Sequence, residues 1–145
     1  MSRDLYHNVK RVTVIAPQSL GATAAGGKTG KVIDRNGFDA VVFEFDFGVV
    51  TATNATVGVE ILEGDATGSL TAAASGNVQG TQSGEGILAG TPRASGVNMN
   101  VSKRLGYIGS HRYVSAKLTP GVSGGIIASC AVVLGAPHYM PVASQ

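Results

Sequence analysis

Apolar and polar residues alternate in several short runs along this chain. In the clearest run, residues 38–47, Phe43, Phe45 and Phe47 share one face and polar side chains occupy the other. Alternation with a period of two residues is typical of a β-strand that buries one face. The pattern therefore predicts a strand with a phenylalanine-rich inner surface.

Other runs have the alternation or the β-branched composition of strands. They lie at residues 11–16, 31–34, 55–63, 97–107, 112–119 and 125–134. The last run is apolar on both faces, which is typical of a central strand. Apolar residues nowhere recur at helical spacing across three turns, so we expect little helix. About eight short strands separated by turns predict an all-β fold, an antiparallel β-sandwich with a jelly-roll-like arrangement.

Turn and loop signals divide these runs. Pro17 is expected to close the first strand, and the small, glycine-rich residues 18–30 to form a loop. Glu63, Gly64 and Asp65 have the composition of a turn. Residues 70–90 show weak periodicity and are expected to hold one or two short strands and a long loop.

Composition fits one domain spanning residues 1–145. Charged residues make up only 14% of the chain. Glycine occupies 21 positions, about twice its usual share, and this glycine content favours turns over helices. The single cysteine, Cys130, excludes an internal disulfide and is expected to be a buried small hydrophobe. Residues 1–11 lack the apolar core of a signal peptide, which predicts synthesis in the cytoplasm.

Charge is distributed in three blocks. Residues 1–35 carry +4, residues 36–92 carry −7 and residues 93–145 carry +5. Opposite charges favour each other on paired strands, so we expect the blocks to pair within the fold. Complementary patches on neighbouring copies or on a lattice are the second interpretation.

Candidate chemistry in the sequence is sparse. Residues 22–29 (ATAAGGKT) match a loose phosphate-loop pattern, but a strand-like segment follows where that motif needs a helix. No two of His7, His111 and His138 lie at metal-ligand spacing. We therefore expect no catalytic residue, no cofactor and no metal site.

Two binding functions remain as alternatives. Lys103, Arg104, Arg112 and Lys117 lie among tyrosines, a composition that single-stranded nucleic acid can use. A carbohydrate-binding module would need exposed aromatic platforms, and the chain has no tryptophan. Both are less favoured than binding to other protein surfaces, and no membrane partner and no specific nucleic acid are expected.

Several short segments, in order, resemble small structural proteins of tailed bacteriophages. They are Asp-Leu-Tyr-His-Asn at 4–8, Ile-Asp-Arg-Asn-Gly-Phe-Asp at 33–39, Glu-Gly-Asp at 63–65, Gly-Tyr-Ile-Gly-Ser-His-Arg-Tyr-Val at 106–114, Leu-Thr-Pro at 118–120 and Ala-Val-Val-Leu-Gly-Ala-Pro at 131–137. Residues 72–97 depart most from this resemblance. The chain is similar to the capsid decoration, or cement, proteins of that group.

This resemblance implies a virion protein on the capsid exterior that docks at junctions between major capsid subunits. It implies a homo-oligomer, for which a trimer is one option, and no enzymatic activity. A neck, tail or baseplate component is the alternative within the virion.

The chain ends are the candidate contact segments. Residues 1–10 are expected to form an N-terminal arm and residues 137–145 a C-terminal tail, either reaching onto neighbouring subunits or simply frayed. Tyr6, His7, His138 and Tyr139 are the candidate anchors, because aromatic side chains dominate interface energetics.

Overall fold

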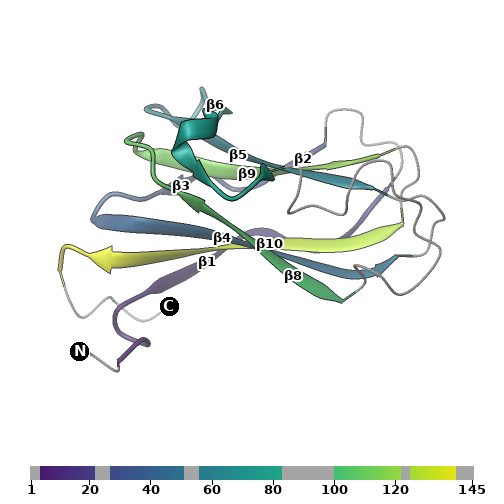
Figure 1. Cartoon of the computed structure of the whole chain (residues 1–145), viewed down its shortest axis with the longest axis horizontal. Coiled ribbons are helices and arrows are strands. Elements are labelled where there is room, and N and C mark those ends of the chain that lie inside the picture. Colours follow the sequence, from purple (N-terminus) through teal and green to yellow (C-terminus); the bar gives the residue numbers. More distant parts are fainter. Residues whose placement is uncertain (1–3, 22–26, 51–55, 83–99, 122–124, 140–145) are drawn as a thin grey trace.

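The computed structural model describes residues 4–21, 27–50, 56–82, 100–121 and 125–139, which build two antiparallel sheets packed face to face (Figure 1). The first sheet has the order β1-β10-β4-β8-β7. Its strands are β1 (Lys10–Leu20), β10 (Ile126–Pro137), β4 (Phe38–Val50), β8 (Val101–Tyr107) and β7 (Val78–Gln79).

The second sheet has the order β2-β9-β5-β6, with β3 also paired to β9. Its strands are β2 (Lys28–Thr29), β3 (Ile33–Asp34), β5 (Val57–Gly64), β6 (Thr71–Ala72) and β9 (Tyr113–Pro120). A 3₁₀ helix, η1 (Ser75–Asn77), precedes β7. The predicted all-β sandwich is thus confirmed.

The strand pairs are nested along the chain. β1 pairs with β10, β2 and β3 pair with β9, β4 pairs with β8, and β5 pairs with β6, all antiparallel. This is the pattern of a long hairpin that has been rolled up so that its successive pairs fall in alternate sheets. That arrangement is a jelly roll, with β7 as an additional short strand at the edge of the first sheet.

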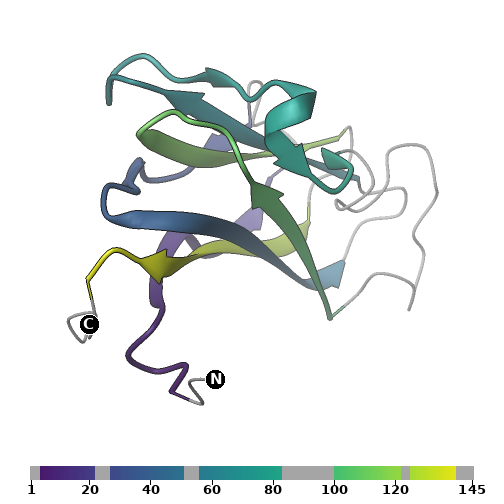
Figure 2. The ribbon, with the colours of Figure 1, turned by 60° about the vertical axis from the view of Figure 1, so that its left-hand side comes forward.

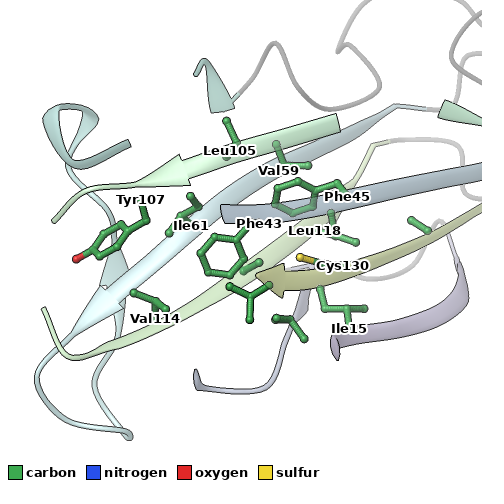
Figure 3. Packing of buried hydrophobic residues seen from close by; sticks show 14 of the residues in the cluster. Ile15, Phe43, Phe45, Val59, Ile61, Leu105, Tyr107, Val114, Leu118 and Cys130 are labelled. Carbon is green, nitrogen blue, oxygen red and sulfur yellow. The ribbon is translucent and has the colours of Figure 1, made fainter. Parts of the chain in front are cut away.

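The core lies between the two sheets (Figure 3). Phe43, Phe45 and Phe47 of β4 are at most 2% exposed and face inward, as the alternation predicts. Ile61 and Leu118 approach them from the second sheet and are fully buried. Burying a side chain of this size contributes about 1.5–3 kcal/mol, so this layer is a main source of the stability of the sandwich.

Cys130 lies in the same core. Its side chain is 1% exposed, and burial raises the pKa of the thiol. The prediction that it packs as a small hydrophobe is confirmed.

Two strand predictions need correction. β1 continues through Pro17 to Leu20, because β1 is the edge strand of its sheet and its pairing with β10 is irregular between Ile15 and Gln18. A proline is tolerated on an edge or at a bulge, where no ladder hydrogen bond needs its missing N–H. The run at 125–134 falls in β10, which has a strand on either side, as predicted, but only one of its faces is buried throughout. On the other face Ala131 is 4% exposed, whereas Ile127 is 45% exposed.

Candidate binding surface at the chain termini

The two ends of the described chain leave the first sheet at the same corner. Lys10, at the start of β1, pairs with Leu134 of β10, and β10 continues to Pro137, which pairs with Phe38 of β4. Figures 1 and 2 both show the N-terminal and C-terminal segments beside this end of the sheet. We call the described residues outside this ladder, residues 4–9 and 138–139, the terminal corner.

The N-terminal part of the terminal corner is a closed turn. The Asp4 carboxylate accepts a hydrogen bond from the His7 backbone N–H at 3.1 Å and contacts His7 Nδ1 at 2.5 Å. The Asn8 N–H donates to the Leu5 carbonyl at 3.3 Å. The hydrogen bonds from His7 lower the pKa of the Asp4 carboxyl group. Hydrogen bonds within residues 4–8 therefore hold this segment in a turn.

This turn presents apolar surface to solvent. The side chain of Leu5 is 71% exposed and that of Tyr6 is 74% exposed. The Tyr6 and His7 rings meet edge to face, with centroids 5.0 Å apart. Leu5 was not among the contact residues predicted from the sequence, although a lone apolar residue in a polar segment could have indicated it.

The C-terminal part is held by His138. Its backbone N–H donates to the Gly37 carbonyl at 2.9 Å, and its Nε2 lies 2.9 Å from Asp39 Oδ1. The next residue, Tyr139, is 89% exposed. The structure thus brings the four predicted anchors to one corner, two of them as exposed rings and two as histidines paired with aspartates.

The predicted limits of the arm and the tail were too generous. Lys10 is already the first residue of β1, and Pro137 is the last residue of β10. Pro137 lacks a backbone N–H, but at the end of a strand the loss affects a single ladder position. Residues 1–3 and 140–145 lie outside the described part of the chain.

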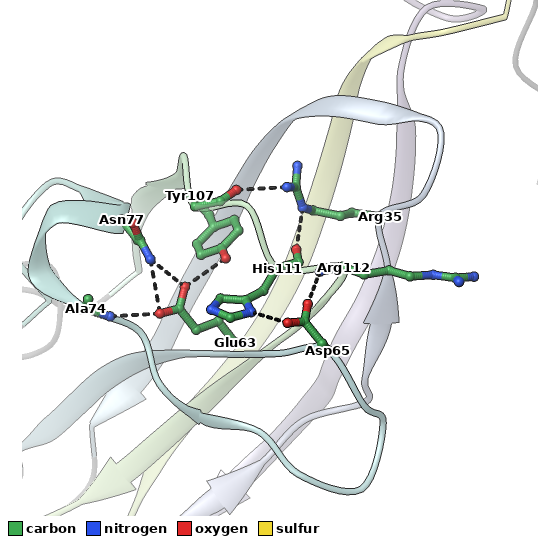
Figure 4. A network of polar contacts seen from close by, with 9 residues as sticks. Arg35, Glu63, Asp65, Ala74, Asn77, Tyr107, His111 and Arg112 are labelled. Carbon is green, nitrogen blue, oxygen red and sulfur yellow. Dashed lines mark hydrogen bonds and ion pairs between the residues drawn. The ribbon is translucent and has the colours of Figure 1, made fainter.

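Sequence reasoning also missed a buried polar network near the 106–114 segment (Figure 4). Glu63, which was expected where the strand at 55–63 meets a turn, lies within β5 and is 6% exposed. It accepts hydrogen bonds from the Tyr107 hydroxyl at 2.7 Å, from Asn77 Nδ2 at 2.9 and 3.1 Å, and from the Ala74 N–H at 3.1 Å. Burial raises the pKa of Glu63, but these hydrogen bonds outweigh burial and hold it below the ordinary value.

The same network orders the loop between β8 and β9. Burial and the bond to Glu63 raise the pKa of Tyr107 to about 12. The Arg35 guanidinium donates to the Gly109 and His111 carbonyls at 2.8 and 2.7 Å and lies over the Tyr107 ring. The Glu63 carboxylate, the Tyr107 hydroxyl and the Arg35 guanidinium all have hydrogen-bond partners within the fold. The network therefore holds the loop in place.

Opposite charges pair within the fold, as the block pattern predicts. Glu44 of β4 faces Arg104 of β8, and Glu60 of β5 faces Lys117 of β9. Arg11 Nε also lies 3.4 Å from Glu44 Oε2, across the outer surface of the first sheet. The hollow of about 450 Å³ on that surface is therefore lined by charges that are partly compensated.

The glycine-rich segment does not have the architecture of a phosphate loop. Lys28 and Thr29 form β2, pair with Leu118 and Lys117 of β9, and lead into β3 rather than into a helix. Residues 22–26 lie outside the described part of the chain. The described residues hold no group of three or more potential metal ligands.

Two residues of the region considered for nucleic acid, Tyr107 and Arg112, are engaged within the fold. Tyr107 is 1% exposed and cannot offer its ring to a base, and Arg112 binds Asp34 through Nε and a second guanidinium nitrogen at 3.0 and 2.6 Å. No helix in the described residues is long and apolar enough to cross a membrane.

Comparison of the chain with protein-family models, with curated proteins and with solved structures finds no match.

Proposed function

We propose that this protein is a non-enzymatic structural component of a tailed-phage virion that decorates and stabilises the capsid by binding at junctions between major capsid subunits. The segments that resemble phage structural proteins support this role. A rigid jelly roll is also a suitable body for lattice binding, although a fold alone does not define a function. The protein would act on the capsid exterior as a homo-oligomer, with a trimer as one option.

The observation that carries the proposal is the terminal corner. Leu5, Tyr6 and Tyr139 are 71–89% exposed, and they gather where both ends of the chain leave the sheet. Large aromatic side chains are the groups that most often supply binding energy at protein interfaces. The Asp4–His7 turn and the His138–Asp39 pair order the backbone beside these rings, which lowers the entropy lost on binding.

Copy number tests the assignment. Purified particles of the phage that carries this gene are analysed by quantitative mass spectrometry against the major capsid protein. A ratio near that of the capsid subunit supports decoration. A few copies per particle would place the protein in the neck, tail or baseplate, and absence from particles would contradict a virion role.

A binding measurement tests the surface. Undecorated capsids are titrated with the purified protein and with Tyr6→Ala, Tyr139→Ala and the double variant. We expect at least a tenfold loss of affinity for the double variant, as for anchor residues elsewhere. Ile108→Ala is the matched control, because Ile108 is 59% exposed but lies outside the terminal corner. Equal losses in the control and the double variant would reject this surface.

A further inference from the structure

A groove opens along the edge where β1 of the first sheet meets β3 of the second. It has a volume of about 270 Å³. Its floor includes Val12, Ile33 and Leu134, and its rim includes Lys10, Lys31 and Asp34. Ile33 and Leu134 are at most 4% exposed, so the floor is the edge of the hydrophobic core itself.

Backbone contacts fix the walls of this groove. The Lys31 N–H donates to the Val14 carbonyl of β1 at 2.9 Å, and Ile33 pairs with Val114 of β9. Gly30 permits this approach, because a Cβ at that position would lie 2.9 Å from the Val14 carbonyl oxygen and closer still to its side chain. The groove is therefore a preformed feature of the two-sheet junction.

The rim keeps an unbalanced positive charge. Asp34 is bound by Arg112 at 2.6 and 3.0 Å, and this pairing lowers the pKa of its carboxyl group. Within the described residues, neither Lys10 nor Lys31 makes an ion pair. An apolar floor between two such lysines fits a ligand that alternates carboxylates with an aliphatic side chain.

The groove is also continuous with the terminal corner. Lys10 directly follows residues 4–9, and its ladder partner is the floor residue Leu134. A protein that receives Leu5 and Tyr6 would thus lie beside the rim lysines. The two surfaces can be covered by one partner.

We propose that this groove binds an extended acidic segment of the partner protein, with an aliphatic side chain on the floor and its flanking carboxylates on Lys10 and Lys31. This inference rests on the proposed function, because that function identifies the major capsid protein as the partner that would carry the acidic segment. A protein segment is favoured over single-stranded nucleic acid, because none of the described residues that line the groove has an aromatic ring on which a base could stack.

The first experiment needs no capsid. The ¹⁵N-labelled protein is titrated with an octapeptide of alternating Glu and Val, with its Lys and Val counterpart, and with dodecathymidylate. We expect saturable amide shifts at residues 10–12, 31–34 and 134 with the acidic peptide only, at concentrations of about 1 mM or below, weakening as salt is added. No shift, equal shifts with the basic peptide, or the same shifts with the oligonucleotide would overturn the proposal.

The second experiment uses capsids. Lys10→Glu/Lys31→Glu should lower affinity at least tenfold, whereas Lys28→Glu, an exposed lysine on β2 outside the groove, should change it less than twofold. If the double variant binds like wild type, the groove is excluded while the decoration role stands. If wild type does not bind capsids at all, the proposed function fails, and the peptide titration alone decides the groove.

Discussion

Glu63 illustrates at the level of single residues how this fold uses a buried charge. A carboxylate at 6% exposure is costly unless hydrogen bonds replace its lost hydration. Here Tyr107, Asn77 and the Ala74 N–H supply them. The network links β5, the η1 segment and the end of β8, three parts of the chain whose contact no local sequence pattern could indicate.

Glu63→Gln should therefore destabilise the protein by about 1–3 kcal/mol at neutral pH, since it removes the charge from the hydrogen-bonded acceptor. The pKa of Glu63 is lower in the folded protein than its ordinary value of 4.5. Its stabilisation is thus present above that ordinary value and is lost as pH falls through the folded pKa. The difference between variant and wild type should shrink over this acidic range, as measured by urea unfolding at several pH values.

Glu60→Gln is the control, because Glu60 lies on the same strand with its side chain partly exposed. Its effect should stay within about 0.5 kcal/mol. A pH-independent difference for Glu63→Gln would show that the charge of Glu63 contributes nothing to stability.

Gly109 is a second position where the network constrains the sequence. A Cβ at this position would lie 2.9 Å from Glu63 Oε2 and closer still to the Tyr107 phenol. Gly109→Ala should destabilise the protein by about 1–3 kcal/mol through this overpacking. Gly68→Ala, where a Cβ meets nothing within 4 Å, should have little effect in the same thermal melts. Similar melting temperatures for the two variants would contradict this account of the loop.

Strands were predictable from the sequence where alternation is strong. The inward face of β4 was identified correctly, because the alternate positions Phe43, Phe45 and Phe47 define one apolar face and the residues between them are polar. The ends of strands were harder to predict from the sequence. Pro17 and Pro137 are signals to stop a strand, yet Pro17 lies at an irregular part of an edge strand and Pro137 at the end of β10, where a missing N–H affects at most one ladder position. Glu63 was expected at the boundary between the strand at 55–63 and a turn, and β5 continues one residue further, to Gly64.

The end of β10 gives a prediction at the scale of elements. Deleting residues 139–145 should leave the melting temperature unchanged, since in the part of the chain that the structure describes the hydrogen bonds at this end stop at His138. Deleting residues 137–145 removes the pairing of Pro137 with Phe38 and both contacts of His138, and should lower the melting temperature by several degrees. Differential scanning calorimetry separates the two cases. A large loss in the shorter deletion would mean that the tail is part of the folded body.

The terminal corner was only half predictable. Tyr6, His7, His138 and Tyr139 could be chosen as candidates by residue type and position in the chain. Their gathering at one corner depends on the pairing of β1 with β10, which joins the two ends of the sequence. The rim and floor of the groove were not foreseen either, since their residues come from β1, β3 and β10.

At the scale of the whole molecule, the nested pairing sets the order in which contacts can form. The outermost pair, β1 with β10, closes a loop from Lys10 to Leu134, whereas β5 and β6 are joined by a short connection. Closing a long loop costs conformational entropy before its contacts contribute stability. We therefore expect the outer pair to limit the folding rate.

A circular permutant tests this expectation. Joining residue 145 to residue 1 through a short linker, and opening the chain between Thr67 and Gly68, makes β10 and β1 a local pair. Thr67 and Gly68 are exposed and lie between β5 and β6, so the native pairs stay intact. The loop closed by Lys10 and Leu134 becomes roughly fivefold shorter, which lowers its closure cost by about 1.4 kcal/mol.

If the outer pair is formed in the transition state, refolding should accelerate by up to about tenfold, with a much smaller change in the unfolding rate. Stopped-flow measurements of tyrosine fluorescence give both rates. An unchanged refolding rate at unchanged stability would place the closure of the outer pair after the transition state, and the folding nucleus would then lie in the inner strands.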